Sequence, residues 1–100
     1  MAHFDPISTN YRNSLRDQRD INAMDAILGN PNPNHGELNG HTHQGFPVYH
    51  EHRYNPQIGK CIWAYDAATD TVYFIGFYRE QGRRYELIDG TPNAPRTIRF

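Results

Sequence analysis

Residues 60–79, with the sequence KCIWAYDAATDTVYFIGFYR, decide the fold class of this 100-residue chain. Two runs within it, 60–66 and 71–79, are rich in aromatic and β-branched residues, as β-strands are, and only a short connection separates them. Such a connection joins neighbouring antiparallel strands. A further run of this kind, 47–54, lies just upstream, so we expect a three-stranded antiparallel meander over residues 47–79.

Upstream of the meander, an amphipathic helix is expected over residues 13–29. Apolar residues recur there at helical spacing, and Gly29 followed by Asn30 and Pro31 is a typical helix end. These apolar positions are Leu15, Ile21, Met24, Ile27 and Leu28.

The remaining segments have compositions typical of loops and chain ends. Residues 1–12 are expected to form an N-terminal arm, either a loop or a short strand around His3 and Phe4. Residues 30–46 are so rich in Asn, Pro, Gly and His that we expect a loop without a regular element. Residues 80–100 form a basic C-terminal segment whose two prolines, Pro92 and Pro95, exclude a long final helix. The predicted fold is a single α+β domain, with an N-terminal helix packed on a three- to four-stranded antiparallel sheet.

The net charge and the cysteine content indicate which partners and which cellular compartment to expect. A net charge of −1 provides no general attraction to nucleic acid or to an anionic membrane, although five arginines gather in the last quarter of the chain. One cysteine, Cys61, excludes an intrachain disulfide and indicates either a reducing compartment or a fold that needs no disulfide. With no apolar run of membrane-spanning length and no secretory signal, we expect a soluble cytoplasmic protein with no membrane partner.

Five of the six histidines lie within residues 35–52, where they indicate either acid/base chemistry or a metal site. Two of them, His50 and His52, fall in a predicted strand. The alternation of side chains along a strand places this pair on one face and Glu51 and Arg53 on the other. The remaining three, His35, His41 and His43, belong to the predicted loop.

An ordered set of short motifs runs through residues 13–85. The helix ends in an apolar run followed by Asn30-Pro31, and a Leu-x-Gly comes after it at residues 38–40. Next come the His50/His52 pair, Lys60 at the start of an apolar strand that closes on an acidic turn, and Arg79 six residues before Tyr85. In this order the motifs resemble those of the RelE-type toxins of bacterial toxin–antitoxin pairs, which are small ribonucleases built on an antiparallel sheet with helices on one face.

The resemblance implies a metal-independent endoribonuclease without a cofactor. RNA cleavage through the 2′-hydroxyl needs a base, an acid for the leaving 5′-oxygen, and cations for the phosphate. Histidine suits the first two tasks, and arginine or lysine suits the third. The candidate catalytic residues are His50, His52, Arg79 and Tyr85, and the candidate substrate-binding residues are Lys60, Arg53, Tyr78 and Arg83.

The implied partners are an RNA substrate and a cognate antitoxin or immunity protein, and the need for a ribosome stays open. Two alternatives also stay open. One is a non-catalytic toxin of the related ParE type, or another interaction module, that binds a protein target. The other is a metal-binding domain in which His41-x-His43 and His50-x-His52 act with Glu37 or Glu51.

Overall fold

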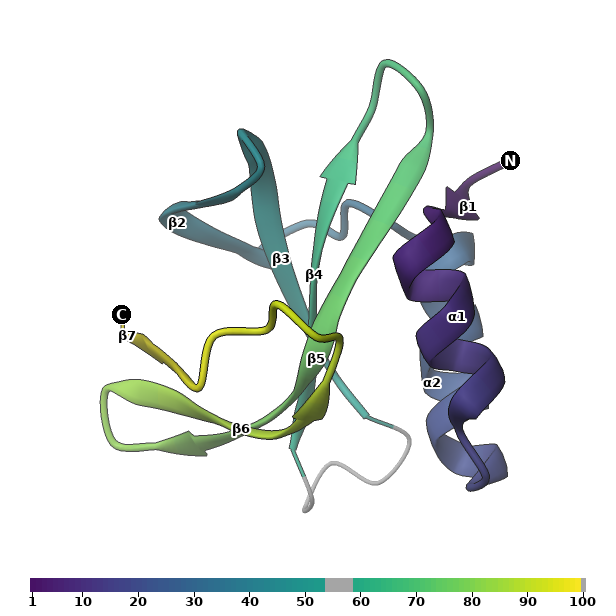
Figure 1. Cartoon of the computed structure of the whole chain (residues 1–100). Coiled ribbons are helices and arrows are strands. Elements are labelled where there is room, and N and C mark those ends of the chain that lie inside the picture. The colour runs from purple at the N-terminus through teal and green to yellow at the C-terminus, as the bar shows by residue number, and fades with distance from the viewer. Residues whose placement is uncertain (54–58, 100) are drawn as a thin grey trace.

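The computed structural model describes residues 1–53 and 59–99, and it shows an α+β protein with two helices packed against a curled, mainly antiparallel sheet (Figure 1). Both helices lie on one side of the sheet, whereas its two ends curl toward each other on the other side. Tyr54, predicted as the last residue of a strand, lies outside the described residues. Within the described part of the chain, no helix is long and apolar enough to cross a membrane.

Two short helices replace the single predicted helix. The first, α1 (Pro6–Ser14), begins after Asp5, whose side chain accepts a hydrogen bond from the backbone N–H of Ser8. The second, α2 (Gln18–Gly29), begins after Asp17, which caps it in the same way. The short strand expected around His3 and Phe4 is confirmed as β1 (His3–Phe4). An arm that continues to residue 12 and a single helix over 13–29 were wrong, because each capping aspartate begins its own helix. The predicted helix end at Gly29 is confirmed.

The predicted meander is confirmed, but the sheet has more strands than we expected. The strands are β1 (His3–Phe4), β2 (Glu37–His43), β3 (Phe46–His52), β4 (Lys60–Asp66), β5 (Thr71–Gln81), β6 (Arg84–Gly90) and β7 (Thr97–Arg99). The central strands β3, β4 and β5 pair antiparallel, and further strands extend the sheet on both sides in the order β2-β3-β4-β5-β6-β7, with β1 parallel to β5.

The loop prediction for residues 30–46 was wrong because tertiary pairing overrides turn composition in its second half. Gln44 and Gly45, with φ angles of 54° and 84°, form the tight turn that folds β2 back onto β3 and pairs His43 with Phe46. Positive φ at both central residues is the geometry of a two-residue hairpin turn. The segment over 80–100 likewise contains β6 and β7, and it has no helix among its described residues.

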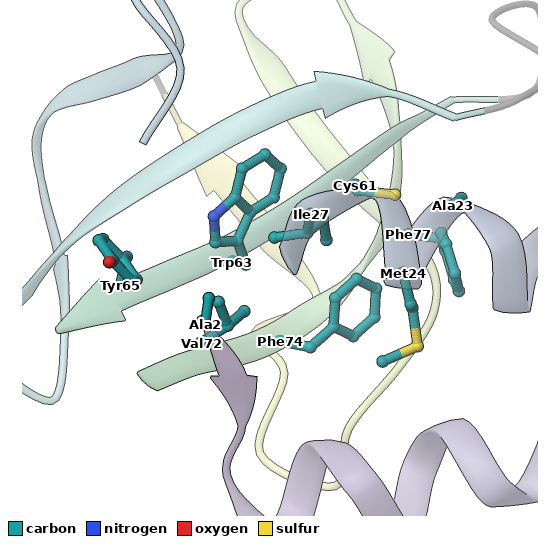
Figure 2. Packing of buried hydrophobic residues seen from close by; sticks show 10 residues of the cluster. All are labelled: Ala2, Ala23, Met24, Ile27, Cys61, Trp63, Tyr65, Val72, Phe74 and Phe77. Carbon is teal, nitrogen blue, oxygen red and sulfur yellow. The ribbon is translucent and has the colours of Figure 1, made fainter. Parts of the chain in front are cut away.

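Two apolar clusters occupy the two faces of the sheet. On the helix side, Trp63, Phe74 and Phe77 pack against Met24 and Ile27 of α2 (Figure 2). Inside the curl, the second cluster is formed by Ile62, Ala64 and Ile75 of the central strands together with Leu38, Val48, Tyr78, Tyr85 and Ile98. Alternate residues of β4 thus contribute to different cores, so any polar residue on these strands belongs to one face by its register.

Candidate functional site

A cluster of four polar and aromatic side chains lies on the sheet face opposite the helices. It consists of His50 from β3, Lys60 from β4, Glu80 from β5 and Tyr85 from β6, and we call it the His50 cluster. Register brings these residues together, because His50 lies opposite Ile62 of the inner core, and Glu80 lies opposite Tyr85. Directly paired residues of antiparallel strands share a face.

The side chains of the His50 cluster are in contact. The imidazole of His50 lies 6.1 Å from the ring of Tyr85, measured between ring centres. The ammonium of Lys60 lies 5.5 Å from the centre of the same ring, and 3.0 Å from the carboxylate of Glu80. Tyr85 itself is buried and approaches both the imidazole and the ammonium, so the cluster combines one buried aromatic ring with the three ionisable side chains of His50, Lys60 and Glu80.

The electrostatic environment tunes two of these groups in opposite directions. Burial lowers the pKa of His50, and the positive charge of Lys60 lowers it further. Burial also lowers the pKa of Lys60, but the hydrogen bond from Lys60 to Glu80, the interaction with Tyr85 and the charge of Glu80 more than offset this effect, so the pKa of Lys60 is raised. Near neutral pH, His50 is therefore a neutral proton acceptor beside a permanent cation.

His52 stands at the open end of the cluster. It is the last residue of β3, its register partner is Lys60, and its side chain is exposed. Its backbone N–H donates to the Glu51 carboxylate over 2.8 Å, and its charge acts on His50. Arg53, which alternation places on the same face as Glu51, forms an ion pair with Asp20 of α2.

Of the other predicted site residues, three arginines lie away from the His50 cluster, whereas Tyr78 pairs with Lys60 in the sheet and belongs to the same inner core as Tyr85. Arg53 is on the helix side, with its guanidinium 4.4 Å from the centre of the Phe77 ring. Tyr78 is 0% exposed and donates its hydroxyl to the carbonyl of Pro95 over 2.7 Å, so it anchors the inner core.

The other two predicted site arginines, Arg79 and Arg83, are exposed. Arg79 pairs with Glu86 on the outer face, opposite to the face that carries Glu80 and Tyr85, because consecutive residues of a strand alternate in direction. Arg83 lies in the tight turn between β5 and β6. The cation beside the candidate acid/base residues is therefore Lys60.

Glu80 is the member of the cluster that sequence reasoning missed. The signal was present, because a strand that buries Tyr78 on its inner face also directs residue 80 to that face. The missing information was that β5 continues past Arg79, to Gln81, and that β6 follows immediately.

The other histidines are dispersed. His41 and His43 lie on β2, and His35 lies in the preceding turn with a φ of 64°. Over residues 1–53 and 59–99, no three His, Cys, Asp or Glu side chains are placed to hold a metal ion. The arrangement of two histidine pairs around one metal is thus not assembled in that part of the chain.

Comparisons with protein-family models, with curated proteins and with solved structures find no match to this chain. The function must therefore be argued from the His50 cluster and its surroundings.

Proposed function

We propose that this protein is a toxin-type, metal-independent endoribonuclease of RelE-like character that works in the cytoplasm, with the His50 cluster as its active site. The observation that supports the proposal most is the contact of His50, Lys60 and Tyr85, three residues from separate strands that the sequence had already indicated for this chemistry. A neutral imidazole beside a held cation is what cleavage of a phosphodiester through its neighbouring hydroxyl requires.

In the proposed reaction, His50 removes the proton from the 2′-hydroxyl of RNA. The 2′-oxygen attacks the adjacent phosphorus, and the bond to the 5′-oxygen of the next nucleotide breaks. His52, in its protonated form, donates a proton to that leaving oxygen. The products are a 2′,3′-cyclic phosphate and a free 5′-hydroxyl, so no water and no redox partner are consumed.

Lys60 and Tyr85 supply the surroundings of the reaction. The Lys60 ammonium holds the phosphate as negative charge gathers on its oxygens, and Glu80 keeps this ammonium charged and in place. The ring of Tyr85 supports both His50 and Lys60. A cognate antitoxin or immunity protein would neutralise this site by covering His50 and Lys60 with an acidic or apolar surface, and an RNA partner would enter from the same side.

The test is cleavage of an end-labelled RNA by the purified protein in the presence of EDTA. We expect cleavage to survive the chelator and to leave cyclic phosphate ends that mass spectrometry can identify. The changes His50→Ala and His52→Ala should each slow cleavage by about 10²- to 10⁴-fold, which is the usual contribution of a general acid or base. Lys60→Met should cost about 10²-fold or more.

His41→Ala and Arg79→Ala are the matched controls, since each removes a polar side chain of the same type from outside the His50 cluster. Both should retain cleavage close to the unmodified rate. Cleavage that disappears with EDTA, or that ignores both His50→Ala and Lys60→Met, would refute the proposal. Growth arrest that persists in those two variants would instead favour a protein target.

A further inference from the structure

A pocket of about 220 Å³ lies on the helix side of the sheet, between α2 and the strands β3 and β4. Its inner surface is apolar, with Cys61 and Trp63 from β4, and Ala23, Ala26 and Ile27 from α2. The polar residues that line it are Asn30, Glu51 and His52, and alternation along β3 directs the side chain of Glu51, but not that of His52, to this face. An apolar interior with few polar groups is the usual construction of a small-molecule site.

The pocket is open because the facing residues of α2 are small. Ala23 and Ala26 are three residues apart, so they lie on the same side of the helix, above Cys61 and Trp63. Trp63 cannot easily move into the space, since its indole N–H donates to the carbonyl of Pro31 over 2.8 Å and only 1% of the residue is exposed. The pocket is therefore preformed, because small side chains leave the space and the hydrogen bond of Trp63 keeps the indole from filling it.

The size and polarity of the pocket fit one planar ring with a hydrogen-bond donor. An apolar cavity of about 150 Å³ is enough to bind benzene, so this one has room for a single nucleobase. Glu51 accepts one bond from the backbone of His52, and a carboxylate has further acceptor sites. A carboxylate prefers a base with an exocyclic amino group, such as the N4 amine of cytosine, and repels the O4 carbonyl of uracil.

We propose that this pocket binds one pyrimidine base of single-stranded RNA and selects cytosine over uracil through Glu51. This inference rests on the proposed function for the identity of the ligand. The pocket and the His50 cluster lie on opposite faces of the sheet, and they come nearest at the end of β3, where His52 borders the pocket and lies two residues from His50.

The experiment uses the only tryptophan in the chain as the reporter. The protein carries one indole N–H, that of Trp63, so a single NMR resonance reports on the pocket. Titration of ¹⁵N-labelled protein with cytidine and with uridine, neither of which carries a phosphate, gives the two dissociation constants. We expect cytidine to shift this resonance and to bind about tenfold more tightly than uridine.

Two variants and a control define the site. Ala26→Leu fills the pocket and should weaken cytidine binding by about tenfold or more, whereas Asn22→Leu places the same side chain on an exposed position of α2 and should change nothing. Glu51→Gln keeps the shape but adds a donor, so the preference for cytidine over uridine should fall to about twofold or less.

Equal affinity for the two nucleosides, or a titration that Ala26→Leu leaves unchanged, would overturn the inference. Indole that binds where neither nucleoside does would also overturn it and would identify the pocket as an apolar ligand site. Cytidine binding that responds to the variants as expected supports the inference even if RNA is not cut, and the failure of cleavage would then count against the proposed function alone.

Discussion

Removal of the Asp20 carboxylate should destabilise this protein far more than removal of a comparable carboxylate at the surface. Asp20 forms an ion pair with Arg53, and the two side chains are only 19% and 11% exposed. The guanidinium also lies over the Phe77 ring, 4.4 Å from its centre. Asp20→Asn keeps the shape of the side chain but leaves the charge of Arg53 without its partner in a largely dry site.

The magnitude follows from the burial. Breaking a fully buried ion pair costs about 3–5 kcal/mol, and the residual exposure of Arg53 favours the lower end of that range. Asp20 also lies in the first turn of α2, where a carboxylate adds about 0.5 kcal/mol through the helix dipole. We therefore expect a loss of about 3 kcal/mol, which corresponds to a fall in melting temperature of about 12–24 °C for a chain of this size.

The assay is urea unfolding followed by circular dichroism, with Asp25→Asn as the matched control. Asp25 pairs with Arg12 over 2.7 Å, but the side chains of this pair are 42% and 35% exposed, so its loss should cost less than about 1 kcal/mol. Replacing both members of the buried pair, with Asp20→Asn and Arg53→Met, should recover about 1 kcal/mol or more relative to Asp20→Asn alone. If Asp20→Asn costs no more than Asp25→Asn, the reasoning from burial is refuted.

Three further predictions concern single groups. Ser8→Ala should lower the free energy of unfolding by about 2 kcal/mol, because the buried Ser8 hydroxyl accepts a hydrogen bond from the Phe74 N–H over 2.7 Å and donates one to Asp5. Denaturant titration measures this loss. A loss no larger than that of Thr9→Ala, at an exposed position, would contradict the prediction. Burial lowers the pKa of His43 and of His50, so the unfolded chain binds more protons than the folded one, and stability should fall as the pH drops below the unfolded value of about 6.5. Unfolding curves at pH 7.5 and 5.5 should show this loss, and a slope that His50→Gln and His43→Gln together leave unchanged would exclude these two groups as its source. Burial raises the pKa of the Cys61 thiol to about 12, so a disulfide reagent at pH 8 should label it only when the protein opens, and prompt labelling of the native protein would disprove its burial.

The helical region shows where local sequence reasoning works and where it stops. The end of α2 at Gly29 was predictable, because Gly29, Asn30 and Pro31 act locally. The break between α1 and α2 was not predicted, although both capping aspartates are visible in the sequence. The apolar residues at helical spacing continue from Leu15, before Asp17, to Leu28, after it, and this pattern predicted one continuous helix although Asp17 is a typical helix cap.

The candidate site shows the same division. Alternation along β3 correctly separated His50 from Glu51, and the strand assignments correctly predicted that Lys60 begins β4. The position of Arg79 relative to Tyr85 was predicted wrongly. Its spacing from Tyr85 suggested one site, but the tight turn after Gln81 pairs Tyr85 with Glu80 and leaves Arg79 on the outer face. The catalytic and substrate-binding roles assigned to these residues stay predictions.

The sequence by itself determined the elements whose causes are local: the antiparallel meander, the end of α2, and the alternation that separates the two faces of each strand. Only the tertiary structure decided that residues 37–43 form a strand, that β6 and β7 extend the sheet, and that His50, Lys60, Glu80 and Tyr85 meet. The physical reason is that strand pairing and the curl of the sheet depend on hydrogen bonds and packing between segments far apart in the chain, and no short stretch of sequence records these contacts.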